Sequence, residues 1–219
     1  VSVGAKQALC NAIEALIGPD DEVIMPTPCW VSYVEMVKIA QGKSVLIKTT
    51  MENNFCLTAE QLEAAITPAT KLLLLCSPNN PTGSVYTLEN LKAIVEVLKK
   101  YPQIVVLADE IYQHILYTGK HETMAQFPEI EDRLIIINGV SKAYAMTGYR
   151  IGWLASHDKD FITAVKRLQG QTISCATTIA QRAAEAAYTG PQECVEEMRQ
   201  AFERRRNLIV ELTKEIPGL

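Results

Sequence analysis

The chain has 219 residues, and 48% of them are hydrophobic, which is enough for the buried core of one large domain or two small ones. Its 21 lysines and arginines against 25 aspartates and glutamates give a net charge of −4, which argues against a nucleic-acid binder and a polybasic membrane anchor. Every apolar run is much shorter than a membrane-spanning helix of about 20 residues, so we expect no membrane partner.

Short apolar runs alternate with longer amphipathic stretches along the chain. In chain order they predict strand 1–3, helix 4–17, strand 22–25, helix 30–40, strand 44–48, helix 58–66, strand 71–76, helix 87–100, strands 103–108, 133–138 and 151–155, and helices 158–169, 177–188 and 191–216. Thr58 followed by Gln61 is a capping box at the start of the third helix. The alternation predicts an α/β fold, with a mostly parallel seven-stranded sheet and helices on both faces.

The sequence lacks the motifs of several common α/β proteins. It has no P-loop, no G-x-G-x-x-G after its first strand and no G-x-S-x-G, which argues against nucleotide-binding and α/β-hydrolase sites. The six cysteines form no C-x-x-C pair and the three histidines have no partner at ligand spacing. We therefore expect free thiols in a reducing cytosol and no metal site. The charged run 203–206 is predicted to be a solvated helix face.

Reactive side chains follow most of the predicted strands, at the point where each strand ends. Ligands of an open parallel sheet bind beyond the carboxyl ends of its strands, so these residues are expected to meet at one rim. They are Gly4, Ala5 and Lys6 after 1–3, Trp30 after 22–25, Asn80 after 71–76, Asp109 and Tyr112 after 103–108, and Ser141 and Lys142 after 133–138.

Each of these features also has an ordinary structural explanation. Asp109 could cap a helix that starts at residue 110, Lys142 could be a surface lysine and Trp30 could lie in the core. Arg150 could form a salt bridge at the rim, residues 80–83 have the composition of a turn, and residues 4–6 could be a plain helix start. Only the joint placement at one rim favours a site.

Residues 139–152, GVSKAYAMTGYRIG, resemble the pyridoxal-phosphate attachment segment of the class I aminotransferases. Three more motifs match in the same order, namely GAKQAL at 4–9, SPNNPTG at 77–83 and DEIY at 109–112. The likeness is greatest to bacterial-type aspartate aminotransferases, in which PCWVSY at 28–33 also has a counterpart. The resemblance implies the large domain of a fold type I pyridoxal-phosphate-dependent transferase.

Residue roles follow from this resemblance, position by position. Lys142 would hold pyridoxal 5'-phosphate as an imine and then move the proton of the substrate Cα. Asp109 would keep the pyridine nitrogen protonated, so that the ring can accept electrons. Tyr112 and Asn80 would hydrogen-bond the phenolic oxygen, and Trp30 would stack on the ring. Trp30 and Asn80 would also contact the substrate.

The same resemblance implies a phosphate site. Backbone N–H groups of Gly4, Ala5 and Lys6 would meet the phosphate at a helix N-terminus, and Arg150 would bind it with its planar guanidinium. Ser141 would add a hydroxyl. One departure is Gly139, where many relatives have a serine, and it implies one hydroxyl fewer or a water in its place.

The implied domain division puts a pyridoxal-phosphate-binding large domain, truncated on its N-terminal side, at 1–200. Residues 201–219 would begin the helix that leads to a small C-terminal domain, absent here, with the family's arginine for the substrate α-carboxylate. The isolated chain would then have little or no transaminase activity.

The implied enzyme is a cytoplasmic aminotransferase that is a homodimer at full length. It would move an amino group between an amino acid and a 2-oxo acid, with aspartate and 2-oxoglutarate as the favoured pair. The alternatives are an alanine, aromatic or kynurenine transaminase, a lyase or synthase on the same fold, and a non-catalytic truncated fragment.

Overall fold

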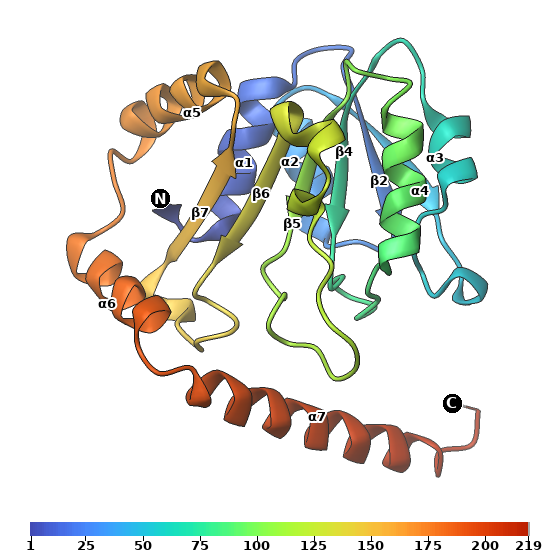
Figure 1. Cartoon of the computed structure of the whole chain (residues 1–219), viewed down its shortest axis with the longest axis vertical. Coiled ribbons are helices and arrows are strands. Elements are labelled where there is room, and N and C mark those ends of the chain that lie inside the picture. The colour runs from blue at the N-terminus through green and yellow to red at the C-terminus, as the bar shows by residue number, and fades with distance from the viewer. Residues whose placement is uncertain (219) are drawn as a thin grey trace.

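Seven strands form one mixed sheet within residues 1–218, the part of the chain that this computed structural model describes (Figure 1). The strands are β1 (Ser2–Val3), β2 (Glu22–Thr27), β3 (Lys43–Lys48), β4 (Thr70–Cys76), β5 (Val105–Asp109), β6 (Leu134–Gly139) and β7 (Ile151–Ser156). Their order across the sheet is β1-β7-β6-β5-β4-β2-β3, and β7 runs opposite to the other six strands, which all share one direction. The predicted α/β class and mostly parallel sheet are confirmed.

The α-helices lie where the sequence predicted them, within a few residues at each end. They are α1 (Ala5–Leu16), α2 (Val31–Ile39), α3 (Ala59–Ala65), α4 (Leu88–Leu98), α5 (Lys159–Thr172), α6 (Thr178–Thr189) and α7 (Glu193–Thr213). The predicted capping box is present, since Gln61 N–H donates to Thr58 Oγ1 and Thr58 N–H donates to Gln61 Oε1. The sequence did not predict the short 3₁₀ helices at Met51–Asn53, Met124–Gln126, Pro128–Arg133 and Thr147–Tyr149.

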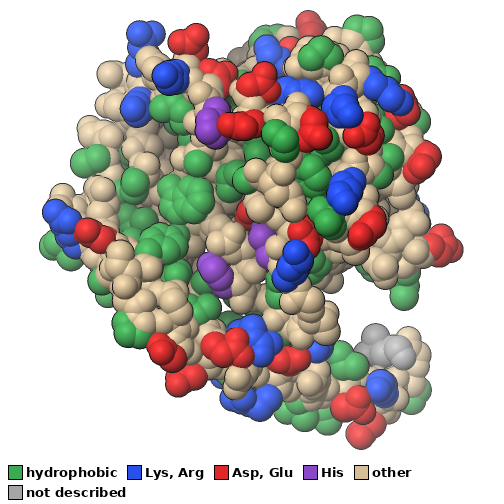
Figure 2. Space-filling model, viewed as in Figure 1, with side chains coloured by type: hydrophobic (Ala, Val, Ile, Leu, Met, Phe, Trp, Pro, Cys, Tyr) green, Lys and Arg blue, Asp and Glu red, His purple; other side chains and the backbone are tan. Residues whose placement is uncertain are grey.

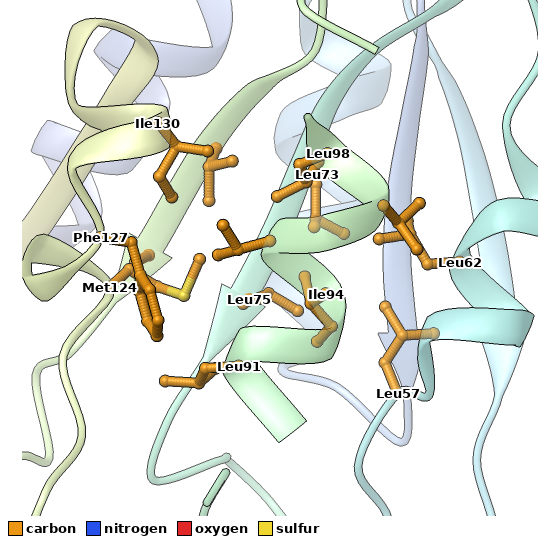
Figure 3. Close-up of a cluster of buried hydrophobic side chains, with 14 of the residues drawn as sticks. Leu57, Leu62, Leu73, Leu75, Leu91, Ile94, Leu98, Met124, Phe127 and Ile130 are labelled. Atoms are coloured by element: carbon orange, nitrogen blue, oxygen red, sulfur yellow. The ribbon is translucent and has the colours of Figure 1, made fainter. Parts of the chain in front are cut away.

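Both faces of the sheet are covered by apolar layers. Successive residues of a strand point to opposite faces, so Leu73 and Leu75 of β4 pack against α3 and α4, while Leu72 and Leu74 pack toward α1 and α2. Figure 3 shows the first layer, in which side chains of α4 and of the segment around Phe127 meet the sheet. Each leucine buried in this way stabilises the fold by about 1.5–3 kcal/mol.

The last helix, α7, extends beneath the sheet and has no buried residue (Figure 1). It contacts the 112–118 loop, where Arg199 Nη1 donates to Leu116 O at 3.2 Å and the Arg206 guanidinium lies 4.7 Å from the centre of the Tyr117 ring. Charged side chains gather along this helix (Figure 2). Arg204, Arg205 and Arg206 are exposed, so the solvated helix face predicted at 203–206 is confirmed. Residue 200, where the large domain was predicted to end, lies inside α7, and the domain division stays a prediction.

Within residues 1–218, no helix is both long enough and apolar enough to cross a bilayer. All six cysteines are free thiols.

Candidate functional site

A pocket of about 330 Å³ opens at the carboxyl ends of β4, β5 and β6, which run parallel and end at the same edge of the sheet. The structure brings the predicted residues together there: Ala5, Lys6, Trp30, Asn80, Asp109, Tyr112, Ser141, Lys142 and Arg150 line the pocket, and Gly4 lies directly against Arg150. Because these residues come from five separate loops, the sheet topology is what gathers them.

Asp109, the last residue of β5, is held from two sides and is 3% exposed. Its Oδ1 accepts a hydrogen bond from the Ile111 N–H at 3.1 Å, and its Oδ2 accepts one from the Tyr33 hydroxyl at 2.7 Å. The chain after Asp109 forms turns and no α-helix within 110–123, so the helix-cap explanation is wrong. Asp109 instead closes a short turn through Ile111.

The charge state of Asp109 depends on what faces it in the pocket. Burial raises the pKa of Asp109 from its ordinary value of 3.8 to about 6, although the Tyr33 and Ile111 hydrogen bonds oppose the rise. A carboxyl group in this setting is mostly ionised at neutral pH, and its buried negative charge is stabilised further when a cation approaches it. The pocket therefore fits a ligand that presents a protonated nitrogen to Asp109.

Lys142 lies in the turn after β6, and its ammonium is 5.5 Å from the centre of the Tyr112 ring. Among residues 1–218, no carboxylate forms an ion pair with it. Burial raises the pKa of the Tyr112 phenol, and the neighbouring Asn80 side chain offsets part of that rise. The half-buried Nζ of Lys142 is therefore held by no ion pair within residues 1–218 and can contact a ligand in the pocket.

An anion cradle forms where α1 begins. The first N–H groups of a helix have no acceptor within the helix, and Ala5 and Lys6, the first two residues of α1, both line the pocket. Gly4 has φ +79°, and a Cβ there would collide with the guanidinium of Arg150. Gly152 allows the Gly4–Ala5 turn to lie directly against β7, because a Cβ at position 152 would collide with the Ala5 nitrogen and the Gly4 carbonyl carbon.

Arg150 itself has a left-handed backbone, with φ +54°, and its Nη1 donates to Thr147 O at 3.0 Å. It forms no ion pair among residues 1–218, so the rim salt bridge is wrong as an explanation. Its planar guanidinium beside a helix N-terminus fits a ligand with a phosphate-like dianion.

The structure explains the glycine at position 139. A Cβ on Gly139 would lie 2.7 Å from Ile151 O and 2.8 Å from Gly152 Cα, on the neighbouring strand β7. A serine side chain therefore has no room at this position in the present packing. Ser141, which is buried and lines the pocket, is the nearby hydroxyl.

Trp30 and Lys6 form one wall of the pocket. Trp30 is the N-cap residue of α2 and is only partly buried, so it belongs to the pocket wall as well as packing on the apolar layer. The ammonium of Lys6 lies 4.7 Å from the centre of the Trp30 ring. The sequence assigned only the backbone N–H of Lys6 to a site, and the place of its side chain was missed.

Tyr33 is the main pocket residue to which the sequence gave no role. It follows Trp30 by three residues at the start of α2, a spacing that places side chains on the same side of a helix and is the signal that could have found it. What the sequence could not show is its partner, because Asp109 lies 76 residues further along the chain.

Comparisons with known proteins agree with this arrangement. A family model described as "Aminotransferase class I and II" matches residues 1–219. The chain is 50% identical to an aspartate aminotransferase of Geobacillus stearothermophilus, over 100% of this chain and 56% of that protein.

Two solved structures superpose closely. The aspartate aminotransferase of Rhizobium meliloti has a TM-score of 0.93 and 46% identity, over 96% of this chain and 53% of that one. The aromatic aminotransferase of Pyrococcus horikoshii has a TM-score of 0.93 and 34% identity, over 98% of this chain and 58% of that one. The chain thus spans little more than half the length of the relatives it matches.

Proposed function

The chain belongs to the class I and II aminotransferase family, and on that premise we propose that it is the cofactor-binding part of an enzyme that moves an amino group between an amino acid and a 2-oxo acid. Class I aminotransferases of the aspartate type use pyridoxal 5'-phosphate. The observation that carries the proposal is the meeting of Lys142, Asp109 and the Arg150 cradle in one pocket.

The residues of the pocket fit this cofactor at three points. Asp109 fits a protonated nitrogen, the cradle of Gly4 and Arg150 fits a phosphate, and Lys142 offers a primary amine in the same pocket. When bound, the cofactor supplies an electron sink for the pair left on the substrate Cα after that carbon loses a proton.

The residues would divide the work as follows. Asp109 would hold the proton on the ring nitrogen, and Tyr112 and Asn80 would hydrogen-bond the ring oxygen. Lys142 would attach the cofactor through Nζ and, once the amino acid has displaced it, would take the proton from Cα and return one to the product.

The other residues of the pocket would hold the two ligands in place. Arg150, Ser141 and the N–H groups at the start of α1 would bind the phosphate. Trp30 would stack on the ring and shield it from water. Trp30 and Asn80 would also contact the substrate at the pocket wall.

We assign aspartate and 2-oxoglutarate as the substrate pair. The relatives named for aspartate are 50% and 46% identical to the chain, whereas the relative named as an aromatic aminotransferase is 34% identical. The ammonium of Lys6 at the pocket wall, which forms no ion pair within residues 1–218, also suits a dicarboxylic substrate, because such a substrate has a second carboxylate to bind. The homodimer and the cytoplasmic location stay predictions.

Borohydride trapping tests the proposal in the full-length protein incubated with pyridoxal phosphate. Borohydride should fix the cofactor on the peptide that contains Lys142, and mass spectrometry should find it there. Lys142→Ala should abolish the visible absorption band, whereas Lys166→Ala, on the exposed face of α5, should keep it. A wild-type protein that carries no label at Lys142 would contradict the proposal.

Amino donors then separate the substrate classes. With 2-oxoglutarate as acceptor, we expect kcat/KM to be highest for aspartate among aspartate, alanine, phenylalanine and kynurenine. If kcat/KM is highest for phenylalanine, the assignment of aspartate as the amino donor is wrong and the enzyme is an aromatic aminotransferase.

A further inference from the structure

Tyr33 connects two residues that the proposed function assigns to the cofactor ring. It is 1% exposed, and its hydroxyl donates to Asp109 Oδ2 at 2.7 Å. Its ring meets the Trp30 ring edge to face, with the ring centres 5.3 Å apart and the planes at 89°. One side chain therefore contacts both the acid expected at the ring nitrogen and the aromatic ring expected to stack on the cofactor.

The helix that carries Tyr33 fixes its position. Tyr33 lies in the first turn of α2, and its N–H donates to Trp30 O at 3.1 Å. The ring packs in the apolar layer with Leu9 of α1 and Leu74 of β4, which holds the hydroxyl over the end of β5. The side chain has little freedom to leave Asp109, because its whole ring is enclosed.

The hydrogen bond acts on the charge of Asp109. Burial drives Asp109 toward its protonated form, and donation from Tyr33 is the largest effect that opposes it. Burial and the nearby Asp109 raise the pKa of the Tyr33 phenol well above its ordinary value, so the phenol keeps its proton and remains a donor. Only one Asp109 oxygen is held by Tyr33, and the other is held by the Ile111 N–H.

We propose that Tyr33 is a positioning residue that keeps the Asp109 carboxylate ionised and aimed into the pocket, and so keeps the shared proton on the cofactor's ring nitrogen. This inference rests on the proposed function, since it concerns the same pocket. A carboxylate that loses a donor becomes a stronger base, and the proton between nitrogen and oxygen then moves toward the oxygen. A ring that loses this positive charge withdraws electrons less well.

The test replaces the hydroxyl alone. Tyr33→Phe, in the full-length holoenzyme loaded with pyridoxal phosphate labelled with ¹⁵N in the ring, should move the ¹⁵N resonance from the pyridinium toward the neutral pyridine position. The loss of one hydrogen bond to a buried charge should lower kcat by roughly tenfold to a hundredfold, with KM changed much less.

Tyr86→Phe is the matched control. Tyr86 is 2% exposed, and its hydroxyl accepts the Leu57 N–H at 2.8 Å, so this variant also loses a buried hydroxyl, but one whose hydrogen bond goes to Leu57 and not to Asp109. It should keep the wild-type ¹⁵N resonance and kcat. Equal shifts in both variants would mean a general effect of lost hydroxyls, and the inference would be wrong.

A second substitution covers the case in which Tyr33→Phe does not fold. Incorporation of 4-aminophenylalanine at position 33 keeps the shape and an N–H donor of lower acidity, so the ¹⁵N resonance should fall between the wild-type and pyridine positions. A wild-type resonance in every variant at position 33 overturns the inference while the proposed function stands. Failure of wild-type protein to bind the cofactor at Lys142 instead overturns the proposed function itself.

Discussion

Asp109 is an acidic residue in a buried position, which disfavours its charged form. In the cofactor-free protein, burial raises the pKa of Asp109 from 3.8 to about 6. Between about pH 4 and pH 6, Asp109 is therefore protonated in the native state and ionised in the unfolded chain. This group therefore stabilises the fold below about pH 4, and that contribution is lost as the pH rises through 6.

The prediction concerns Asp109→Asn, which removes the titration. Between pH 4 and pH 8 the cofactor-free wild type should lose about 3 kcal/mol of unfolding free energy that the variant does not lose. This amount corresponds to the raised pKa of Asp109, which lies about two pKa units above its ordinary value. Urea unfolding at several pH values measures the difference. If the difference in unfolding free energy between variant and wild type is the same at all pH values, the pKa of Asp109 is not raised in the native state.

The anion cradle depends on glycine at position 152, and Gly152→Ala tests this. The added methyl group collides with the first turn of α1, so the affinity for pyridoxal phosphate should fall at least tenfold and the fold should lose about 1–3 kcal/mol. Gly148→Ala is the control, because an added Cβ meets nothing within 4 Å there. Fluorescence titration of both variants with the cofactor gives the comparison.

Sequence alone could indicate which residues follow the strands, and this was enough to assemble Asp109, Lys142 and Trp30 in one site. It could not show contacts between distant segments. The hydroxyl of Tyr33 on Asp109 and the close approach of Gly139 to Gly152 both depend on how strands and helices pack. Their chemistry is ordinary for a buried tyrosine or a strand glycine, so no local pattern marks them.

The loop between β5 and β6 carries Tyr112, which lines the pocket, and it is held in place by the buried Glu110. Glu110, 4% exposed, anchors its far end: Oε1 accepts the Thr123 hydroxyl at 2.8 Å and the Met124 N–H at 3.1 Å, and Oε2 lies 3.0 Å from His121 Nε2. The loop is therefore pinned at a point next to Asp109.

Glu110→Ala should destabilise the protein by about 2–4 kcal/mol, because it leaves buried donors unpaired. It should also speed hydrogen exchange at the Met124 N–H, whereas Glu129→Ala, on an exposed 3₁₀ turn, should change neither quantity. Unchanged exchange at Met124 would show that Glu110 does not pin the loop.

The elements were predictable to different degrees. Apart from the two-residue β1, the strands contain apolar residues in segments of five to seven residues, and the α-helices carry apolar periodicity over seven or more residues, and those patterns located them. The 3₁₀ helices have only three to six residues, too few for a period to appear. The order of the strands, and the antiparallel direction of β7, arise from pairing between distant segments that the sequence pattern does not encode.

At the scale of the whole molecule, the pocket has few cations for a dicarboxylic substrate. Among residues 1–218 its cationic side chains are Lys6, Lys142 and Arg150, and the proposed cofactor uses two of them. We therefore expect the 219-residue chain on its own to bind pyridoxal phosphate but to turn over aspartate and 2-oxoglutarate little or not at all. A coupled assay for oxaloacetate checks this, and turnover near that of the full-length enzyme would contradict it.

The pairing of β1 with β7 also sets an order of events. Within the described residues 1–218, residues 2 and 3 pair with no strand other than β7, at 151 and 152, and the turn that follows them meets Arg150. On a ribosome, this edge cannot close until the roughly 150 residues that separate its two strands have been made. On the proposed function, the phosphate site for the vitamin-derived ligand would therefore be completed only after β7 has emerged, later than the central strands β4, β5 and β6.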